Sequence, residues 1–288
     1  MRSDPRKLGS FLRELADQYD SEYFKILGQK IIMDGVVEGH TAALMEEYSD
    51  QPGYCGVLNL DNQKALEMIV ESANEAGFPV HTHAIGDKAS GMMADAYKEV
   101  ALRTSNFNHR NVLCHLQVVS PETIHMCGDY NIIAVVAPTW APVMEPYFSE
   151  SIRYLGEKRG WEQYPVKAFE EAGATICFHT DYPVTTIMSV PLSVYTAVKR
   201  ARPKNDPDGG PKSVNNPDEA ISAMRALLAM TINVAYMCKQ ENHLGTFAIG
   251  KVANATVYTK DFIHCDPEEI MDAQLLATIV DGEEVYKA

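Results

Sequence analysis

The chain alternates short, β-branched apolar runs with longer amphipathic stretches over residues 30–178. The apolar runs, which we expect to form strands, are Lys30–Met33, Phe78–Thr82, Asn111–Leu116, Ile132–Val136 and Thr175–Phe178. The amphipathic stretches, which we expect to form helices, are Gln63–Ala76, Lys88–Arg103, Pro121–Tyr130 and Tyr164–Ala172. Alternation of this kind predicts parallel strands joined by right-handed crossovers, and therefore an α/β fold.

Two further patterns follow the last of these strands. The first predicts one long helix over Asp218–Cys238, for which Asn216 supplies the N-cap and Pro217 lies in the first turn. The second begins near residue 244 and predicts strands over Ala253–Tyr258 and Leu276–Val280. The dipeptide at 281–282, Asp-Gly, predicts a hairpin turn after the second of these strands.

The composition excludes some classes of function for this protein. The 288 residues carry a formal net charge of −14, and such a surface repels phosphate backbones and anionic lipids, so we expect neither nucleic-acid nor membrane partners. The first ten residues, MRSDPRKLGS, lack the apolar core of a signal peptide. Six cysteines without a C-x-x-C pair predict reduced thiols. We therefore expect a cytoplasmic protein.

Side chains that carry chemistry collect around the strand ends. Lys30 begins KIIMDG, His81 and His83 end FPVHTH, His115 ends NVLCH, and Asp181 follows TICFHT. In parallel α/β folds, functional residues gather at the carboxyl ends of the strands. Imidazole and carboxylate groups are ligands that suit zinc and similar divalent ions. The sequence therefore predicts a divalent metal site, with zinc as the first candidate.

Each of these residues also has an ordinary structural explanation. A His-x-His places both rings on one face of a strand without binding anything, and His115 alone is typical of a core histidine bonded to backbone. Asp181 precedes Tyr182-Pro183 and can shape a turn, and Lys30 can be a solvated charge beside a strand. Their shared placement at the ends of consecutive strands favours the metal site.

Five ordered motifs carry a family resemblance. They are KIIMDGVVEGHTAAL (30–44), HTHAIGDKA (81–89), HLQVVSPE (115–122), HTDYPV (179–184) and LGTFAIGKVANATVYTKDF (244–262). Together they resemble the YtcJ-like branch of the amidohydrolase superfamily (amidohydrolase family 3), which includes N-substituted formamide deformylases and exoenzyme-regulator proteins. HTHAIGD is the most specific of the five, and the match runs from about residue 24 to 287.

The resemblance implies a metal-dependent hydrolase on a (β/α)8 TIM-type barrel. His83 and His115 would ligate one metal. Lys30 would lie nearby, as a carboxylated lysine that bridges two metals. Asp181 would be a ligand and the catalytic group that accepts the proton of the attacking water and returns it to the leaving amine.

Further residues are expected to have supporting roles. Gln117 lies two residues after His115 and so points to the same face of a regular strand. His81 and Gln117 would lie beside the substrate or behind the metal ligands. Trp140 stands where relatives often carry histidine, and Ala137 stands where they often carry glutamine, so the substrate pocket would be reshaped here.

Part of the family pattern is not found in this sequence. The superfamily's first barrel strand carries a His-x-His that completes the metal site, and nothing upstream of Lys30 resembles it. By the family's order, residues 1–242 would be a partial barrel (strands four to eight) and residues 243–288 the C-terminal strands of a small β domain. We therefore expect a piece of a longer enzyme with low metal occupancy and weak activity. Open strand edges predict a homo-oligomer.

These observations leave three functions open. The first is a metal-dependent hydrolase of linear amides, or of other carbon–nitrogen bonds that are not peptide bonds. The second is a deaminase or cyclic amidase of the same superfamily. The third is a non-catalytic regulatory or binding protein with a degenerate metal site. A Rossmann-like domain is disfavoured because no glycine-rich phosphate loop follows any strand.

Overall fold

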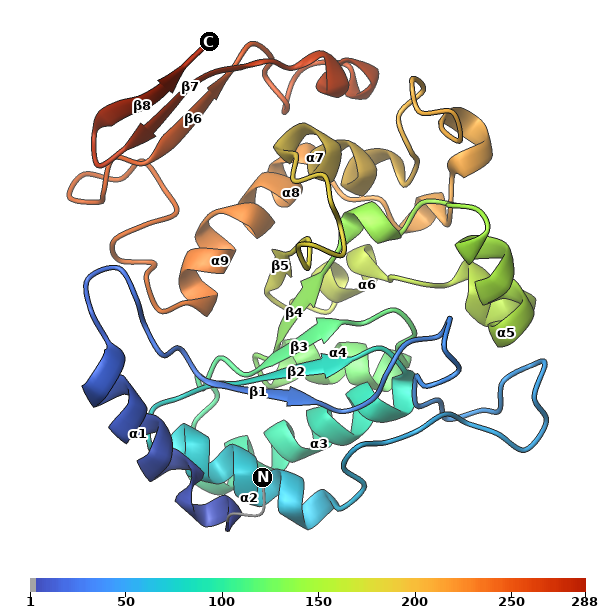
Figure 1. Ribbon diagram of the computed structural model, residues 1–288, viewed down its shortest axis with the longest axis vertical. Helices are drawn as coiled ribbons and strands as arrows, with labels where there is room; N and C mark the ends of the chain where they lie inside the picture. Colours follow the sequence, from blue (N-terminus) through green and yellow to red (C-terminus); the bar gives the residue numbers. More distant parts are fainter. Residues whose placement is uncertain (1–3) are drawn as a thin grey trace. The chain divides into compact units, whose positions relative to one another are not determined.

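Two units make up the chain (Figure 1), and the computed structural model describes residues 4–288 of it. Unit 1 comprises the residues up to Val135 together with Ser149–Thr175. Unit 2 comprises Val136–Phe148 and Ile176–Ala288. Among residues 4–288, no helix is both long enough and apolar enough to cross a membrane.

Unit 1 is built on a parallel sheet whose strands lie side by side in chain order. They are β1 (Gln29–Ile32), β2 (Val80–Ala84), β3 (Val112–His115) and β4 (Ile133–Val136). All four correspond to predicted strands. β2 begins two residues later than predicted because the N–H of Phe78 donates to Ala73 and closes the preceding helix.

Helices α1 (Leu8–Tyr19), α2 (Gln63–Glu75) and α3 (Asp87–Thr104) lie on one side of this sheet (Figure 1). The sheet face that they cover carries Val80, Thr82 and Ala84, which are buried. His81 and His83 alternate with these residues and are half-buried on the other face. Side chains alternate between the two faces along β2, so one face carries core residues and the other carries His81 and His83.

The other helices of unit 1 are shorter or bent. α4 (Pro121–Asp129) begins at Ser120, whose hydroxyl accepts from the N–H of Thr123. α5 (Tyr147–Trp161) bends at Gly156, where φ is 79°, and α6 (Val166–Glu171) leads to the next strand. α4 and α6 correspond to predicted helices, whereas the sequence analysis did not identify α1 or α5.

Unit 2 continues the alternation with β5 (Ile176–Phe178), which corresponds to the fifth predicted strand. The N–H of His179, just beyond β5, donates to the carbonyl of Val136 at 3.0 Å. The helices that follow are α7 (Val190–Lys199), α8 (Ala223–Met230) and α9 (Ile232–Met237). The sequence analysis did not identify α7.

The prediction of one long helix over 218–238 is wrong. Asn216 precedes only a 3-10 turn (Pro217–Glu219), and the hydroxyl of Ser222 caps α8 by accepting from Arg225 at 3.3 Å. Thr231 then leaves the helical region (φ −123°, ψ −93°) and separates α8 from α9. Its hydroxyl donates to Leu227, and a threonine that bonds back to its own helix in this way competes with the helical hydrogen bonds.

The C-terminal strands form a three-stranded antiparallel sheet in the order β6 (Ala255–Tyr258), β7 (Leu275–Val280) and β8 (Glu283–Lys287). The turn between β7 and β8 has positive φ at both Asp281 (52°) and Gly282 (83°), as a two-residue hairpin with a right-handed twist requires. The two predicted strands and the predicted hairpin are confirmed. The domain boundary between residues 242 and 243 stays a prediction.

At the amino ends of the strands, two buried asparagines hold unit 1 together. The amides of Asn74, at the end of α2, and Asn111, before β3, donate to each other at 3.0 and 2.9 Å. The Asn111 oxygen also accepts from the N–H of Val80 at 2.8 Å, and the Asn74 amide donates to Phe78 at 2.9 Å. This network fixes the first residues of β2 and β3 relative to each other and to the end of α2.

We expect Asn111→Ala to lower the free energy of unfolding by about 1–3 kcal/mol, because it leaves buried donors of Asn74 and Val80 unpaired. The exposed Asn242→Ala is the control, with an expected change within about 0.5 kcal/mol. Urea denaturation of both variants measures the difference. An Asn111→Ala protein as stable as the control would contradict this account of the network.

Candidate metal centre

Two histidine rings meet at the carboxyl end of the unit 1 sheet. His83 is the fourth residue of β2, and His115 is the last residue of β3. Their ring centroids lie 4.5 Å apart, and the rings are edge-on at 63°. The structure thus brings together the two residues that the sequence analysis proposed as ligands of one metal.

The backbone at the end of β3 makes this meeting possible. Cys114 lies directly opposite His83 in the sheet, so a regular strand would turn His115 toward the other face. Instead, φ is 82° at His115 and 54° at Leu116. These left-handed conformations are unusual for residues other than glycine, and they interrupt the alternation where β3 ends. His115 is buried, with 4% of its surface exposed.

A buried carboxylate anchors the loops around His83. One oxygen of Asp34 accepts from the N–H of Ile85 at 3.0 Å. The other oxygen accepts from Gly86 at 2.8 Å and from Ala43 at 2.9 Å. Burial raises the pKa of the Asp34 carboxyl, and these three backbone donors and the nearby His83 counteract that rise in part. The carboxylate thus joins the segment after β1 to the turn after β2.

The segment after β1 orients the His83 ring. Nε2 of His83 lies 3.0 Å from the carbonyl of Gly35 and 3.5 Å from Oδ1 of Asp34. Because a carbonyl only accepts, Nε2 carries the proton in this hydrogen bond and Nδ1 keeps its lone pair. Histidines that bind metals commonly donate their second N–H to a carbonyl or carboxylate in this way. The donor set therefore fits a divalent ion bound through Nδ1 of His83.

The glycine and aspartate of HAIGD have structural roles. A Cβ at Gly86 would lie 2.0 Å from the carbonyl of Ala43, so only glycine allows this close approach. Asp87 is the first residue of α3, and its carboxylate accepts from the N–H groups of Met45 (2.8 Å) and Lys88 (3.0 Å). The segment after β1 is thereby held against the start of α3.

Lys30 does not lie at the carboxyl end of its strand. It is the second residue of β1, is exposed, and pairs with His81, whereas Ile32 pairs with His83. Lys30 and His81 share the face of His83 but lie one side-chain repeat before it along the sheet. The place of Lys30 near the start of β1 agrees with the strand predicted over residues 30–33 and is away from the end where His83 and His115 meet.

Gln117 is buried beyond the left-handed turn. Its amide donates to the side-chain oxygen of Gln163 at 2.6 Å, and its carbonyl accepts from the N–H of Tyr164 at 2.9 Å. The positive φ angles before it remove the regular alternation that related Gln117 to His115 in the sequence. Its proposed place behind the ligands stays a prediction.

In unit 2, the segments after β4 and β5 contact each other. The indole N–H of Trp140 donates to the hydroxyl of Thr185 at 2.7 Å, and the Trp140 ring lies edge-on to His179 at 5.2 Å. Asp181 is exposed, has φ of 51°, and accepts from the N–H of Val184 through its carbonyl at 2.7 Å. Asp181 therefore shapes a turn, and its catalytic role stays a prediction.

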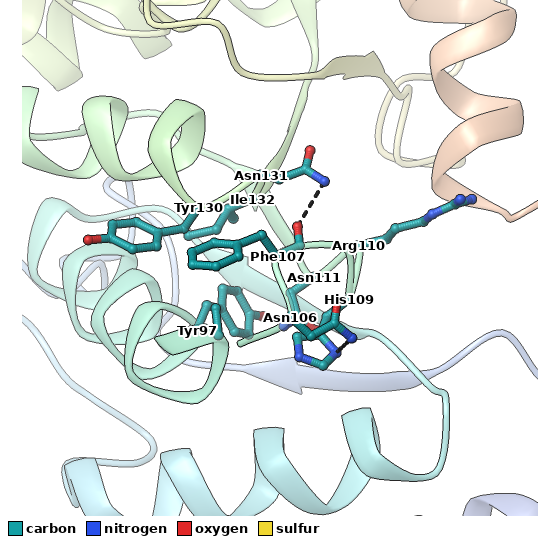
Figure 2. A pocket seen from close by; sticks show the side chains of 10 residues that line it. Tyr97, Asn106, Phe107, His109, Arg110, Asn111, Tyr130, Asn131 and Ile132 are labelled. Carbon is teal, nitrogen blue, oxygen red and sulfur yellow. Dashed lines mark hydrogen bonds between the residues drawn. The ribbon is translucent and has the colours of Figure 1, made fainter. Parts of the chain in front are cut away.

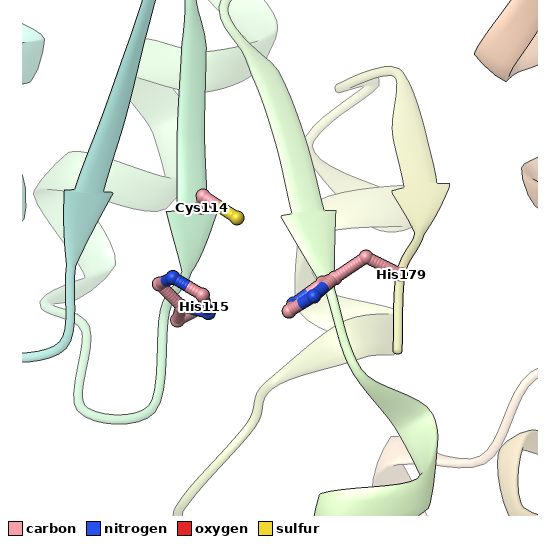
Figure 3. A group of neighbouring side chains, drawn as sticks. All are labelled: Cys114, His115 and His179. Atoms are coloured by element: carbon pink, nitrogen blue, oxygen red, sulfur yellow. The ribbon is translucent and has the colours of Figure 1, made fainter. Parts of the chain in front are cut away.

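Cys114 and His179 are two further candidate ligands that were not among the predicted site residues. Figure 3 shows Cys114 beside His115 at the end of β3, and His179 directly after β5. Cys114 could have been identified from the alternation of side chains along a strand. That alternation places Cys114 on the same face of the sheet as His83, its partner in the neighbouring strand.

A pocket at the opposite end of unit 1 lies away from this chemistry. It is lined by residues that include Tyr97, Asn106, His109, Asn111 and Tyr130 (Figure 2). Asn111 precedes β3, so the pocket is at the amino ends of the strands. In parallel α/β folds that end is associated with stability rather than catalysis.

The chain is similar to known proteins over nearly its whole length. It matches the amidohydrolase family model over residues 2–286. Protein LONG AFTER FAR-RED 3 of Arabidopsis thaliana is 31% identical, with 92% of this chain and 44% of that protein covered. YtcJ of Bacillus subtilis is 26% identical, with 95% and 50% covered. The N-substituted formamide deformylase of Arthrobacter pascens is 27% identical, with 78% and 39% covered.

The chain spans half or less of the length of these relatives. A solved structure of similar fold is described as an uncharacterized metal-dependent hydrolase from Pyrococcus horikoshii. Its TM-score is 0.71 at 24% identity, with 90% of this chain and 50% of that chain covered. The predicted α/β fold with a parallel sheet is confirmed, while the incomplete barrel and the small β domain stay predictions.

We expect Asp34→Asn to lower the free energy of unfolding by about 1–3 kcal/mol, because the new amide group must face at least one buried backbone N–H. The exposed Asp61→Asn is the matched control. Thermal and urea denaturation compare the two variants. Equal effects of the two substitutions would show that the carboxylate is not the anchor described here.

Proposed function

Because the chain belongs to the amidohydrolase family, we propose that it is the metal-binding part of a hydrolase that cleaves linear amide bonds with an activated water. The bonds in question are carbon–nitrogen bonds other than peptide bonds. The observation that carries the proposal is the contact of the His83 and His115 rings, with Nε2 of His83 held by Gly35.

In this proposal, His83 and His115 hold a divalent ion, with zinc as the first candidate. Imidazole nitrogens are common zinc ligands, and the fixed orientation of His83 reduces the entropy lost on binding. The ion would supply Lewis-acid activation of water and of the substrate carbonyl. Lys30, in its carboxylated form, would be a further oxygen ligand. Lys30 is exposed and lies one repeat before His83 on the same face of the sheet.

Asp181 is proposed to move the proton. It would accept a proton from the attacking water and return it to the leaving amine. His81, Gln117 and Trp140 are proposed to line or support the substrate side of the site. The bond from Trp140 to Thr185 supports such a role, because it restrains the segment that follows Asp181.

The substrate class rests on the relatives. An N-substituted formamide deformylase is among them, so we propose N-substituted formamides as the first substrates to test. A deaminase or cyclic amidase activity and a non-catalytic binding role remain the alternatives. We also propose a cytoplasmic location and a homo-oligomer. The exposed Ile32 on edge strand β1 supports the oligomer.

We expect the purified chain to hold less than one zinc ion, and added zinc to bind at the histidine pair. His83→Ala and His115→Ala should each weaken zinc binding by at least about tenfold, because each removes a ligand. The exposed His125→Ala is the control and should bind zinc as the unaltered chain does. Calorimetric titration with zinc, checked by elemental analysis, measures this. Zinc binding that neither substitution changes would exclude this site.

We expect slow, zinc-dependent release of formate from an N-substituted formamide. Asp181→Asn should lower kcat by about 100-fold or more, because it removes the proton acceptor. The exposed Asp208→Asn should leave the rate unchanged. A zinc-loaded chain without any hydrolysis would favour the non-catalytic alternative. Equal rates for the two variants would remove Asp181 from the mechanism.

A further inference from the structure

Cys114 lies where a third metal ligand would be expected. It is the residue opposite His83 in the pairing of β2 with β3, so both side chains project from the same face of the sheet. Neighbouring strands in a sheet are about 4.8 Å apart, so these two side chains project side by side. Cys114 is buried, with 4% of its surface exposed.

The thiol also lies close to the second histidine. The sulfur of Cys114 and a ring nitrogen of His115 are within 4.8 Å of each other (Figure 3), whereas Cys114 is related to His83 by strand register and not by a short distance between ligand atoms. Adjacent residues of a regular strand point to opposite faces, so this proximity depends on the left-handed backbone at His115. The conformation that brings His115 to His83 therefore also brings it to Cys114.

We propose that Cys114 is a ligand, as a thiolate, of the ion that His83 and His115 hold. The inference rests on the proposed metal site and assigns it a sulfur donor. Zinc in proteins is usually four-coordinate, so two imidazoles leave positions that other donors must fill. On binding, the thiol loses its proton to solvent and the sulfur forms a bond to the ion.

A sulfur donor changes which ions the site prefers. Thiolate is a soft ligand and favours zinc, cobalt or cadmium over magnesium, calcium or manganese. A site made only of imidazole and carboxylate groups would discriminate less strongly. The metal preference of this chain therefore follows from a residue that does not belong to the histidine motifs.

A second buried cysteine provides a matched control. Cys127 lies in α4 and is fully buried, and burial raises the pKa of its thiol far above the usual range. An inert, structural thiol of this kind fills space as a small apolar side chain. If Cys114 were only such a thiol, both cysteines would respond alike to added metal.

The test is cobalt binding to the full chain, followed by absorption spectroscopy. We expect a sulfur-to-cobalt charge-transfer band in the near ultraviolet for the unaltered chain and for Cys127→Ala. The band should be absent from Cys114→Ser and Cys114→Ala. Cobalt affinity should fall by at least about tenfold in both. Far-ultraviolet circular dichroism establishes that each variant is folded.

X-ray absorption at the zinc edge gives a readout that does not depend on cobalt. The unaltered chain should show a sulfur neighbour at about 2.3 Å, and Cys114→Ser should show only nitrogen and oxygen neighbours at about 2.0–2.2 Å. Bound cobalt without a charge-transfer band, or a band that persists in Cys114→Ser, overturns the proposal for Cys114 alone. A chain that binds no cobalt overturns both this proposal and the metal site.

Discussion

The buried carboxylate of Asp34 is the interaction on which the candidate site depends. It accepts three backbone N–H groups, two from the turn after β2 and one from the segment after β1. A charged group buried to this extent is tolerated only when its lone pairs are satisfied. His83 lies in β2 just before that turn, and its Nε2 lies against Gly35 and Asp34 in the segment after β1. The position of the imidazole is thus a consequence of how the carboxylate is satisfied.

Most strands of the parallel sheet could be predicted from the sequence alone. The β-branched runs that form strands alternate with the amphipathic stretches that form helices, and the two have different hydrophobic periods. The Asp-Gly turn at 281–282 is similarly local. The conformation at His115 does not follow from local pattern, because its φ is positive and no residue type signals it. The break at Thr231 also depends on hydrogen bonds that the sequence does not display.

The two histidines of the candidate site could be predicted from the sequence, but the residues around them could not. His83 and His115 stand out because they end apolar runs, which is visible in the sequence. Asp34 resembles an ordinary turn residue, and Cys114 resembles an ordinary core residue, until the pairing of β2 with β3 is known. The amidohydrolase relatives, of which this chain spans half or less, support the metal chemistry. In the proposed site, the neighbours of the histidines would determine how strongly an ion is held and which ion is preferred.

A crystal structure of the zinc-soaked chain, with anomalous scattering recorded at the zinc edge, tests the central claim most directly. The account predicts an anomalous peak about 2.0–2.1 Å from Nδ1 of His83 and from a ring nitrogen of His115. It also predicts that Nε2 of His83 still donates to Gly35 at close to the present 3.0 Å. A peak held by other residues, or a zinc ion bound to Nε2 with the Gly35 bond broken, would contradict it.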